Sequence, residues 1–371
     1  MFNFFNKKYN YWLQQEIDIC EKYGYNLKKY INYNTHPLHA KQIKIALFDE
    51  LPEDIILKIS KLKYTTEEDI IKERQKYYTL IDEKYFLEKY KPKCIKNKNI
   101  VDKQNALIGT VLGDIIGSTY EFTDHEEVKD LCTKKSFFTD DTVLSIATKC
   151  AIDENEKNPD FAKWYRIFYN KYPRAGYGSG FVNWGLNPNK DAYGSYADGS
   201  AMRVSYIGAY YIDINDVISK AYKSAAVTHN HFEGIKGAIV TAVCIWMCKN
   251  GYTKNEIKEY LNEHYKYTEE QLEIKSYGYL YFNLEHPEKN KFKDKNGLSC
   301  PFAVPYAIYC FLNSNSLESC YKNVLQNFCD ADTVCAIAGG LAGIYYNTLD
   351  NYKEFINEKL TQELISYIRM W

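Results

Sequence analysis

The sequence predicts an all-α protein. Apolar residues recur at helical spacing through most of the chain, and alternating strand patterns are scarce. Glycines four residues apart indicate a helix that packs closely against another backbone. The chain has 371 residues, of which 46% are hydrophobic. It is therefore long enough to bury a large core.

The first 100 residues form helices in this interpretation. Pro52 followed by Glu53 and Asp54 is typical of a helix start, because proline fits the first turn and acids favour its positive end. Thr66, followed by two glutamates, predicts a second start. Residues 90–99 are basic and lack periodicity, which is typical of a linker. We expect a helical extension and linker at residues 1–100 and a main domain at residues 101–371.

Composition limits the partners and the compartment. The formal net charge is −1, so nothing general indicates nucleic acid or an acidic membrane as a partner. The first 100 residues hold 19 Lys and Arg against 14 Asp and Glu. A solvated helical surface explains this excess, and a face that docks a partner is the alternative. Eleven cysteines without paired spacing, and no apolar leader, predict reduced thiols and a cytoplasmic protein.

From Asn105 onward, small and apolar residues dominate. Gly109, Gly113 and Gly117 share one helix face, and Asp114 among them argues for a buried helix in a soluble fold. Further helices are predicted at residues 219–227, 232–249, 304–312 and 333–346. Residues 174–200 and 283–301 are rich in Gly, Asn, Ser and Pro and are predicted to be long loops, which are often functional.

Two acidic clusters carry the chemistry. Each begins an apolar helix, and each alone is more simply explained as a helix cap. Together they indicate two helix ends that face each other, where the carboxylates would repel without cations between them. Oxygen ligands of this kind suit two Mg²⁺ ions, with Mn²⁺ as an alternative. The predicted metal ligands are Thr139, Asp140, Asp141, Asp330, Asp332 and Thr333.

With these clusters in place, the chain resembles the ADP-ribosylglycohydrolase family, and most closely its bacterial members. The resemblance rests on residues 109–122, both acidic clusters, and the segments 175–178, 194–204, 224–231 and 295–305, in the family's order. It implies a compact orthogonal helical bundle with a binuclear metal centre in a cleft. It also implies hydrolysis of the bond between ADP-ribose and an acceptor protein or small molecule.

The resemblance also implies roles for single residues. Asp332, Glu121 and Asp141 would be catalytic, with either Asp332 or Glu121 as the proton acceptor. Carboxylates would stabilise an oxocarbenium-like transition state. Further residues would contact the ADP-ribose. These predicted contacts are Gly176, Tyr177, Gly178, Ser195, Asp198, Gly199, Ser200, Met202, His229 and Asn296.

Two positions depart from the family pattern. Asp198 replaces a usual asparagine, which places an anion where a pyrophosphate is expected, and Cys329 replaces a usual glycine. These changes leave two alternatives open. One is a member that binds ADP-ribose with little turnover, or has a structural role. The other is a hydrolase of a different ribosyl or nucleotide-like substrate. Arginine, serine, nucleic acid and free nucleotide all remain open as acceptors.

Overall fold

The computed structural model describes residues 9–96, 102–123, 128, 130–265, 282–287 and 297–368. The described residues contain helices and no β-strand, with one isolated bridge between Ala197 and Ser299. The predicted all-α class is therefore confirmed. No helix among these residues combines the length and the apolar character that a membrane span requires.

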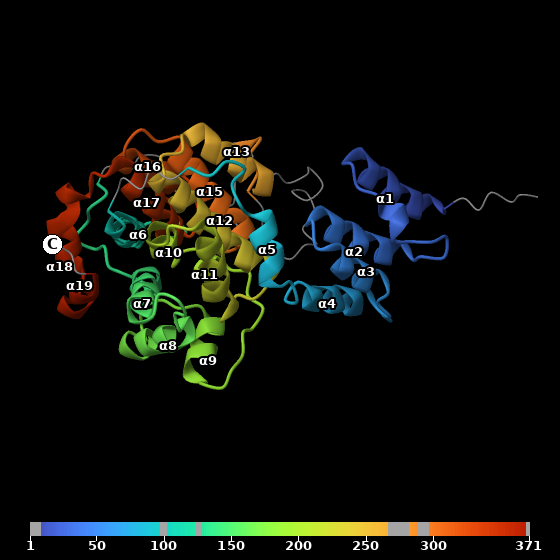
Figure 1. Ribbon diagram of the computed structural model, residues 1–371, viewed down its shortest axis with the longest axis horizontal. Coiled ribbons are helices and arrows are strands. Elements are labelled where there is room, and N and C mark those ends of the chain that lie inside the picture. The colour runs from blue at the N-terminus through green and yellow to red at the C-terminus, as the bar shows by residue number, and fades with distance from the viewer. Residues whose placement is uncertain are drawn as a thin grey trace, which may run out of the picture. The chain divides into compact units, whose positions relative to one another are not determined.

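The chain divides into two units, and the boundary falls between Tyr85 and Phe86. The extent of the main domain predicted above, residues 101–371, stays a prediction. Figure 1 shows the helices of both units along the chain. Up to the boundary they are α1 (Tyr11–Lys22), η1 (Leu27–Lys29), α2 (Pro37–Phe48), α3 (Glu53–Ser60) and α4 (Glu67–Tyr77), with α5 (Glu83–Lys89) crossing it.

The first unit has its own small core. Leu13, Ile17, Ile43 and Ile59 are fully buried in it. Both predicted helix starts are confirmed. Pro52 precedes α3, and the Thr66 side chain caps α4 by accepting a hydrogen bond from the backbone of the third helical residue.

The second unit continues with the remaining helices. They are α6 (Gln104–Gly117), α7 (Asp140–Glu154), α8 (Phe161–Lys171), α9 (Ser179–Leu186), η2 (Asp198–Ser200), α10 (Ser205–Tyr210), α11 (Ile214–Ala226), α12 (Phe232–Lys249), α13 (Lys254–Tyr265), α15 (Cys300–Leu312), α16 (Leu317–Leu325), α17 (Ala331–Tyr346), η5 (Leu349–Tyr352), α18 (Lys353–Lys359) and α19 (Gln362–Ile368). Each of the four helices predicted after residue 200 overlaps one of these.

Helices α6 and α17 pack backbone against backbone in the middle of this unit. A Cβ atom on Gly109 would lie 2.1 Å from the Gly339 carbonyl oxygen, and one on Gly113 would lie 2.1 Å from the Cys335 carbonyl oxygen. One on Gly117 would meet α17 at its first residue, Ala331. The two helices therefore run antiparallel with no side chain between them at these points.

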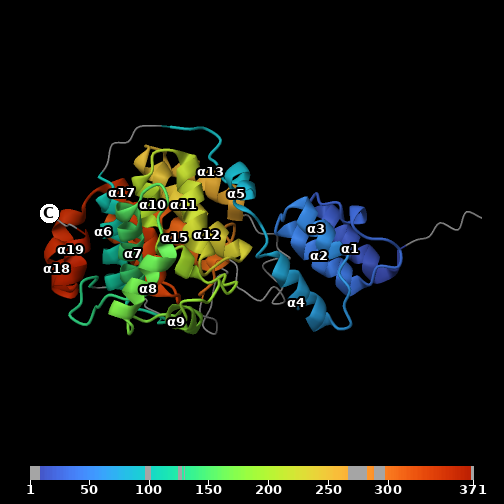
Figure 2. The same ribbon diagram turned by 60° about the horizontal axis from the view of Figure 1, so that its bottom comes forward.

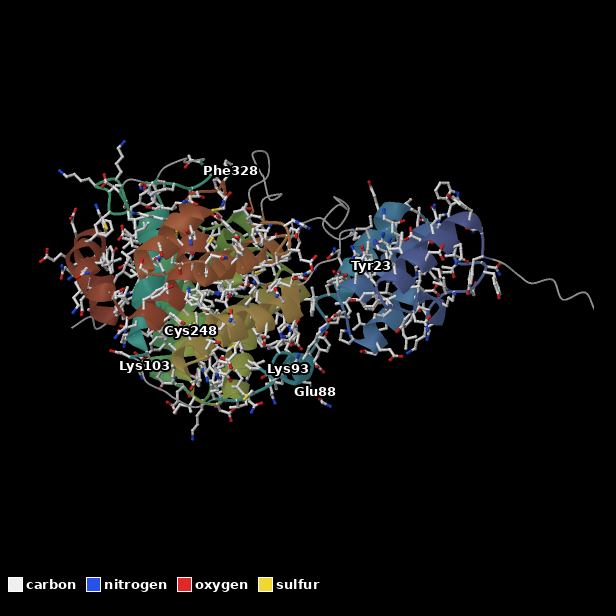
Figure 3. The ribbon with its side chains drawn as sticks, turned by 90° about the horizontal axis from the view of Figure 1, so that it is seen from above. Tyr23, Glu88, Lys93, Lys103, Cys248 and Phe328 are labelled. Atoms are coloured by element: carbon white, nitrogen blue, oxygen red, sulfur yellow. The ribbon has the colours of Figure 1, made fainter. Side chains whose placement is uncertain are left out.

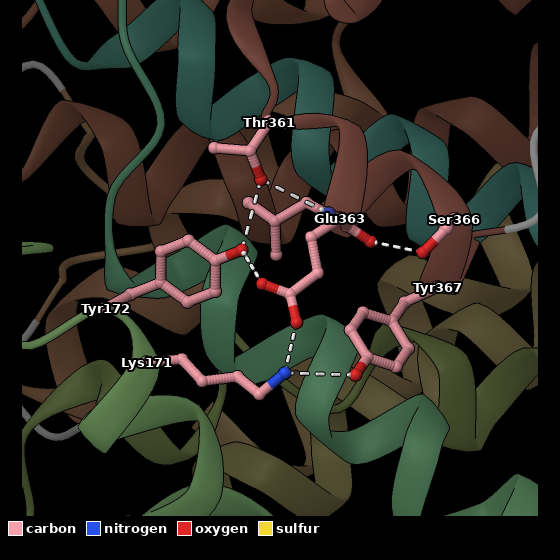
Figure 4. A network of polar contacts seen from close by, with 7 residues as sticks. Lys171, Tyr172, Thr361, Glu363, Ser366 and Tyr367 are labelled. Atoms are coloured by element: carbon pink, nitrogen blue, oxygen red, sulfur yellow. Dashed lines mark hydrogen bonds and ion pairs between the residues drawn. The ribbon is translucent and has the colours of Figure 1, made fainter.

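Within this unit, α7, α10, α12, α15 and α16 pack around this pair, as Figures 1 and 2 show. Every residue of α12 is buried, so its apolar length is explained by a position inside the bundle. At the C-terminal end, α19 is fastened to the end of α8. Figure 4 shows Glu363 bound by the Lys171 ammonium and by the Tyr172 hydroxyl, whose oxygen lies 3.1 Å from the carboxylate.

One predicted loop contains helices. Residues 174–200 include α9 and the short η2, which correct the prediction of a structureless segment. Two glycines in α9 hide its helical tendency in the sequence. Phe181 and Trp184 are buried, and the Arg166 guanidinium lies 3.8 Å from the Trp184 ring centroid. Tertiary packing therefore overrides local propensity here.

Candidate metal centre

Three helix ends bring the acidic residues together. Helix α7 begins at Asp140 and α17 at Ala331, just after Asp330. Asp114 lies on α6 and Glu121 follows that helix by four residues. Because α6 and α17 are antiparallel, the end of α6 meets the start of α17. The helix packing thus places both predicted acidic clusters in one site.

Asp114 holds the start of α7 in place. Its Oδ1 accepts a hydrogen bond from the Thr139 hydroxyl at 2.7 Å. Its Oδ2 accepts from the backbone N–H groups of Thr139 at 2.9 Å and Thr142 at 3.1 Å. The Thr139 side chain in turn caps α7 through the Asp141 N–H group, at 3.3 Å. Asp114 therefore fixes α7 against α6.

The carboxylate oxygens form two groups that could each hold a cation. One oxygen from each of Asp114, Asp141 and Asp332 lies within 4.8 Å of the other two. Glu121, Asp330 and Asp332 form a second group by the same measure. Asp332 belongs to both groups, so it would lie between two cations. Asp140 lines the same cleft but belongs to neither group.

Burial and mutual repulsion raise the pKa values of acids in this site. Burial, followed by the charge of Asp332, raises the pKa of Asp114 and that of Glu121 to about 7. The same two causes raise the pKa values of Asp140, Asp141 and Asp330 well above the usual aspartate range. Clustered carboxylates behave in this way when no cation neutralises them.

The donor set fits a divalent cation. Asp141 is buried, and no described residue forms a hydrogen bond with its Oδ1. A buried carboxylate oxygen without a partner is costly, and a cation would satisfy it. Every acidic side chain in the two groups offers a hard oxygen atom, which suits Mg²⁺ or Mn²⁺ better than a softer metal.

A cleft of about 460 Å³ opens over these residues. Among the predicted residues, most line it. These are Glu121, Asp140, Asp141, Gly176, Gly178, Ser195, Asp198, Gly199, Met202, His229, Asp330, Asp332 and Thr333. Gly176 has a φ of +104°, and a Cβ there would lie 3.4 Å from the Asp140 carboxylate. The glycine loop therefore lies directly beside the acids.

Three predicted residues are placed differently, and a fourth is not described. Thr139 lies behind the cleft, bound to Asp114. The Tyr177 ring stacks on Phe181 at 5.1 Å between ring centroids, and Ser200 donates to the Gly234 carbonyl oxygen. Neither lines the cleft, so their proposed ligand contacts stay predictions without a supporting contact. Asn296 lies outside the described residues.

The prediction missed several residues of the site. Asp114 was taken only as a sign of a buried helix, although an aspartate inside such a helix requires polar partners. Tyr193, Arg203, Phe181 and Leu298 also line the cleft. The sequence carries no local signal for them, since the fold alone brings them to the cleft.

The mouth of the cleft includes Glu121 and Phe122. Phe122 has a φ of +52°, which is unusual for a residue with a side chain. Its N–H group donates to the Cys329 carbonyl oxygen at 3.0 Å, and its ring lies 6.0 Å from that of Phe328 between centroids. Figure 3 shows Phe328 at the edge of the second unit. Cys329 therefore contributes its backbone carbonyl oxygen at the mouth of the cleft, and its side chain is buried.

Comparison with known proteins gives a consistent result. The family model of ADP-ribosylglycohydrolase matches residues 103–350. ADP-ribosylhydrolase ARH3 of Mus musculus is 28% identical over 315 residues, covering 66% of this chain and 83% of that protein. The Homo sapiens ARH3 is also 28% identical and covers 66% of this chain and 85% of its own length. A solved structure described as an ADP-ribosylglycohydrolase-related protein complex has a TM-score of 0.54 at 20% identity. It covers 72% of this chain and 95% of its own, and it supports the fold.

Proposed function

The chain belongs to the ADP-ribosylglycohydrolase family, a family of glycosidic hydrolases, and we propose that it is a Mg²⁺-dependent enzyme that releases ADP-ribose from an acceptor. One observation carries the proposal: two groups of carboxylates, all buried except that of Glu121, share Asp332, which lines a cleft. The acceptor would be a modified protein or a small molecule. The cleft volume of about 460 Å³ lies in the range of small-molecule sites.

The cations would lie between α6, α7 and α17. Asp141 and Asp332 would hold one ion, with Asp140, Thr139 and Thr333 beside it. Asp330, Asp332 and Glu121 would hold the other. Bound Mg²⁺ supplies a Lewis acid that orients ribose hydroxyls and makes a water molecule more nucleophilic. Asp114 acts in this proposal as the residue that positions α7, because both of its oxygens accept hydrogen bonds from the start of that helix.

Glu121 is the better candidate for the proton acceptor. Asp332 belongs to both carboxylate groups, so cations would engage it more fully than a residue that belongs to one. Glu121 takes part in one group and is partly exposed at the cleft mouth. The remaining carboxylates would stabilise the positive charge that develops on the ribose in the transition state.

The other side of the cleft would hold the rest of ADP-ribose. Gly176, Gly178 and Gly199 expose backbone there, and backbone N–H groups suit phosphate oxygens. The segment carrying Gly199 is held in place because the Asp198 N–H group donates to the Leu298 carbonyl oxygen at 3.0 Å.

A second candidate function is hydrolysis of a different ribosyl or nucleotide-like substrate. The Asp198 carboxyl favours it, because it is buried and its Oδ2 has no hydrogen-bond partner in the part of the chain that the structure describes. Burial, followed by the charge of Asp332, also raises its pKa well above the usual range. A carboxylate beside a pyrophosphate would weaken the binding of ADP-ribose itself. It would instead suit a ligand group that donates a hydrogen bond.

The test uses the full chain and a panel of ADP-ribosylated arginine, serine and nucleic acid, with Mg²⁺ or with a chelator. We expect release of ADP-ribose from one substrate class with Mg²⁺ only. Asp141→Asn should abolish release, while Asp153→Asn on the same helix should not, because Asp153 pairs with Lys149 away from the cleft. Turnover in chelator would contradict the metal role. No release from the panel, together with weak ADP-ribose binding by calorimetry, would favour the second candidate.

A further inference from the structure

His229 lines the cleft from its own segment between α11 and α12. The ring is almost completely buried, with 4% of the residue exposed. Its Nε2 lies 3.3 Å from the position that a Cβ on Gly199 would occupy. The far edge of this imidazole therefore points towards the loop that carries Gly199.

The near edge of the ring is bound by a short chain of side chains. The Thr228 hydroxyl lies 2.7 Å from His229 Nδ1. The same hydroxyl oxygen accepts a hydrogen bond from Arg203 Nη2 at 2.9 Å. Arg203 is fully buried, and a guanidinium can only donate. Thr228 must therefore receive one hydrogen bond from this partner.

The direction of the remaining bond follows by elimination. If His229 Nδ1 carried a proton, Arg203 and His229 would both donate to Thr228. The Thr228 hydroxyl hydrogen would then have no acceptor among the described residues, and burial keeps water away from it. Leaving a buried donor unpaired costs about 1–3 kcal/mol. Thr228 therefore donates to Nδ1, and the ring proton of a neutral imidazole lies on Nε2.

Further contacts hold Arg203, and with it the row of side chains that ends at His229, in place. Arg203 Nη2 also donates to the Ser224 carbonyl oxygen at 2.8 Å, and its guanidinium stacks 4.2 Å from the Tyr165 ring centroid. The Tyr165 hydroxyl is bound in turn by Ser224 and Thr148, at 2.7 and 2.8 Å. Burial and the nearby Arg203 charge lower the pKa of His229 well below its usual value, so the ring stays neutral.

We propose that Arg203 and Thr228 are positioning residues that hold His229 as a neutral hydrogen-bond donor, with its Nε2–H group directed to an acceptor oxygen of the bound ligand. The ligand chemistry that fits is a phosphate oxygen of a nucleotide sugar. This part rests on the proposed function, in which ADP-ribose fills the cleft. The state of the ligand-free ring does not depend on it.

The first experiment measures that state directly. Long-range ¹H–¹⁵N correlation spectra of the full chain, labelled at histidine, distinguish the two tautomers. The His229 signal is assigned from its loss in His229→Gln. We expect the Nε2–H form in the native protein and a mixture in Thr228→Val, whereas Thr228→Ser should restore the native form. An Nδ1–H or doubly protonated ring in the native protein at neutral pH would overturn the inference.

The second experiment measures ADP-ribose binding by calorimetry in a double-mutant cycle. Glutamine places an amide N–H group near the position of Nε2, and no tautomer is involved. Thr228→Val should weaken binding about 3- to 10-fold when residue 229 is histidine, as expected for one hydrogen bond. The same change should have little effect in the His229→Gln background. Equal losses in both backgrounds would show a merely structural role for Thr228 and overturn the inference.

Thr148→Val is the matched control. It removes a buried hydroxyl of the same network, at a position that does not contact His229. It should lower the melting temperature and leave both the tautomer and the affinity unchanged. If ADP-ribose does not bind at all, the proposed function fails, while the spectra still decide the tautomer.

Discussion

Replacing Asp332 by asparagine should separate stability from function. The asparagine Oδ1 can still accept the hydrogen bond that the Thr333 N–H group donates to Asp332 at 2.9 Å. The substitution therefore removes a charge and keeps a local contact. Asp332 is also the acid shared by both carboxylate groups. Removing its charge therefore lowers the repulsion in both groups at once.

The magnitude follows from Coulomb's law. Two carboxylate oxygens at most 4.8 Å apart repel by about 3.5 kcal/mol at an effective dielectric constant of about 20. Protonation of neighbouring acids relieves part of this repulsion. We therefore expect Asp332→Asn to raise the free energy of unfolding by about 2 kcal/mol in chelator, which raises the melting temperature by about 3–4 °C.

Magnesium should reverse the order of stability. At about 100 times its dissociation constant, a bound ion adds about 2.7 kcal/mol to the native protein. The variant should gain less than about a quarter as much, which leaves it less stable than the native protein, and it should release no ADP-ribose. Calorimetric melting with Mg²⁺ and with chelator measures both effects, with the exposed Asp350→Asn as the charge control. A variant less stable than the native protein in chelator, or an equal gain from Mg²⁺ in both, would refute the reasoning.

Three further predictions concern stability. Gly113→Ala should lower the free energy of unfolding by about 3 kcal/mol or more, because its Cβ would lie 2.1 Å from the Cys335 carbonyl oxygen; a loss below about 1 kcal/mol in denaturant titration would contradict this close packing. Burial lowers the pKa of His264 from 6.5 to about 3, so the unfolded chain takes up a proton that the folded chain refuses. The free energy of unfolding should therefore fall as the pH drops from about 6.5 to about 3, by up to about 1.4 kcal/mol per pH unit. His264→Gln should flatten this dependence between about pH 7 and about pH 5, as measured by denaturant titration at each pH. Glu363→Gln should cost less than about 1 kcal/mol because its pair with Lys171 is largely exposed, and ADP-ribose release should be unchanged.

The packing of α6 could be predicted from the sequence because a single physical rule decides it. Glycines four residues apart leave one helix face without side chains, so another backbone can approach. The partner helix could not be predicted in the same way. Gly339 and Gly343 mark α17 as small-faced, but several other helices of the chain also contain glycine.

The candidate site divides along a similar line. The acidic clusters were predictable because an acid next to a helix start is visible in the sequence. The direction of loop side chains was not. Tyr177 lies between two glycines that line the cleft, yet its own ring packs against Phe181. Asp114 and Arg203 come from the interiors of the fold, where only tertiary contacts show what each side chain binds.

The close contact between α6 and α17 also fixes the length of the chain there. An α-helix turns by about 100° for each residue. One residue inserted between Gly109 and Gly113 would swing the Asp114 carboxylate about a quarter of a turn away from Thr139. It would also turn Gly113 and Gly117 off the face that meets α17. This helix must therefore keep its glycines and its number of residues, whereas the loops around the cleft can be lengthened.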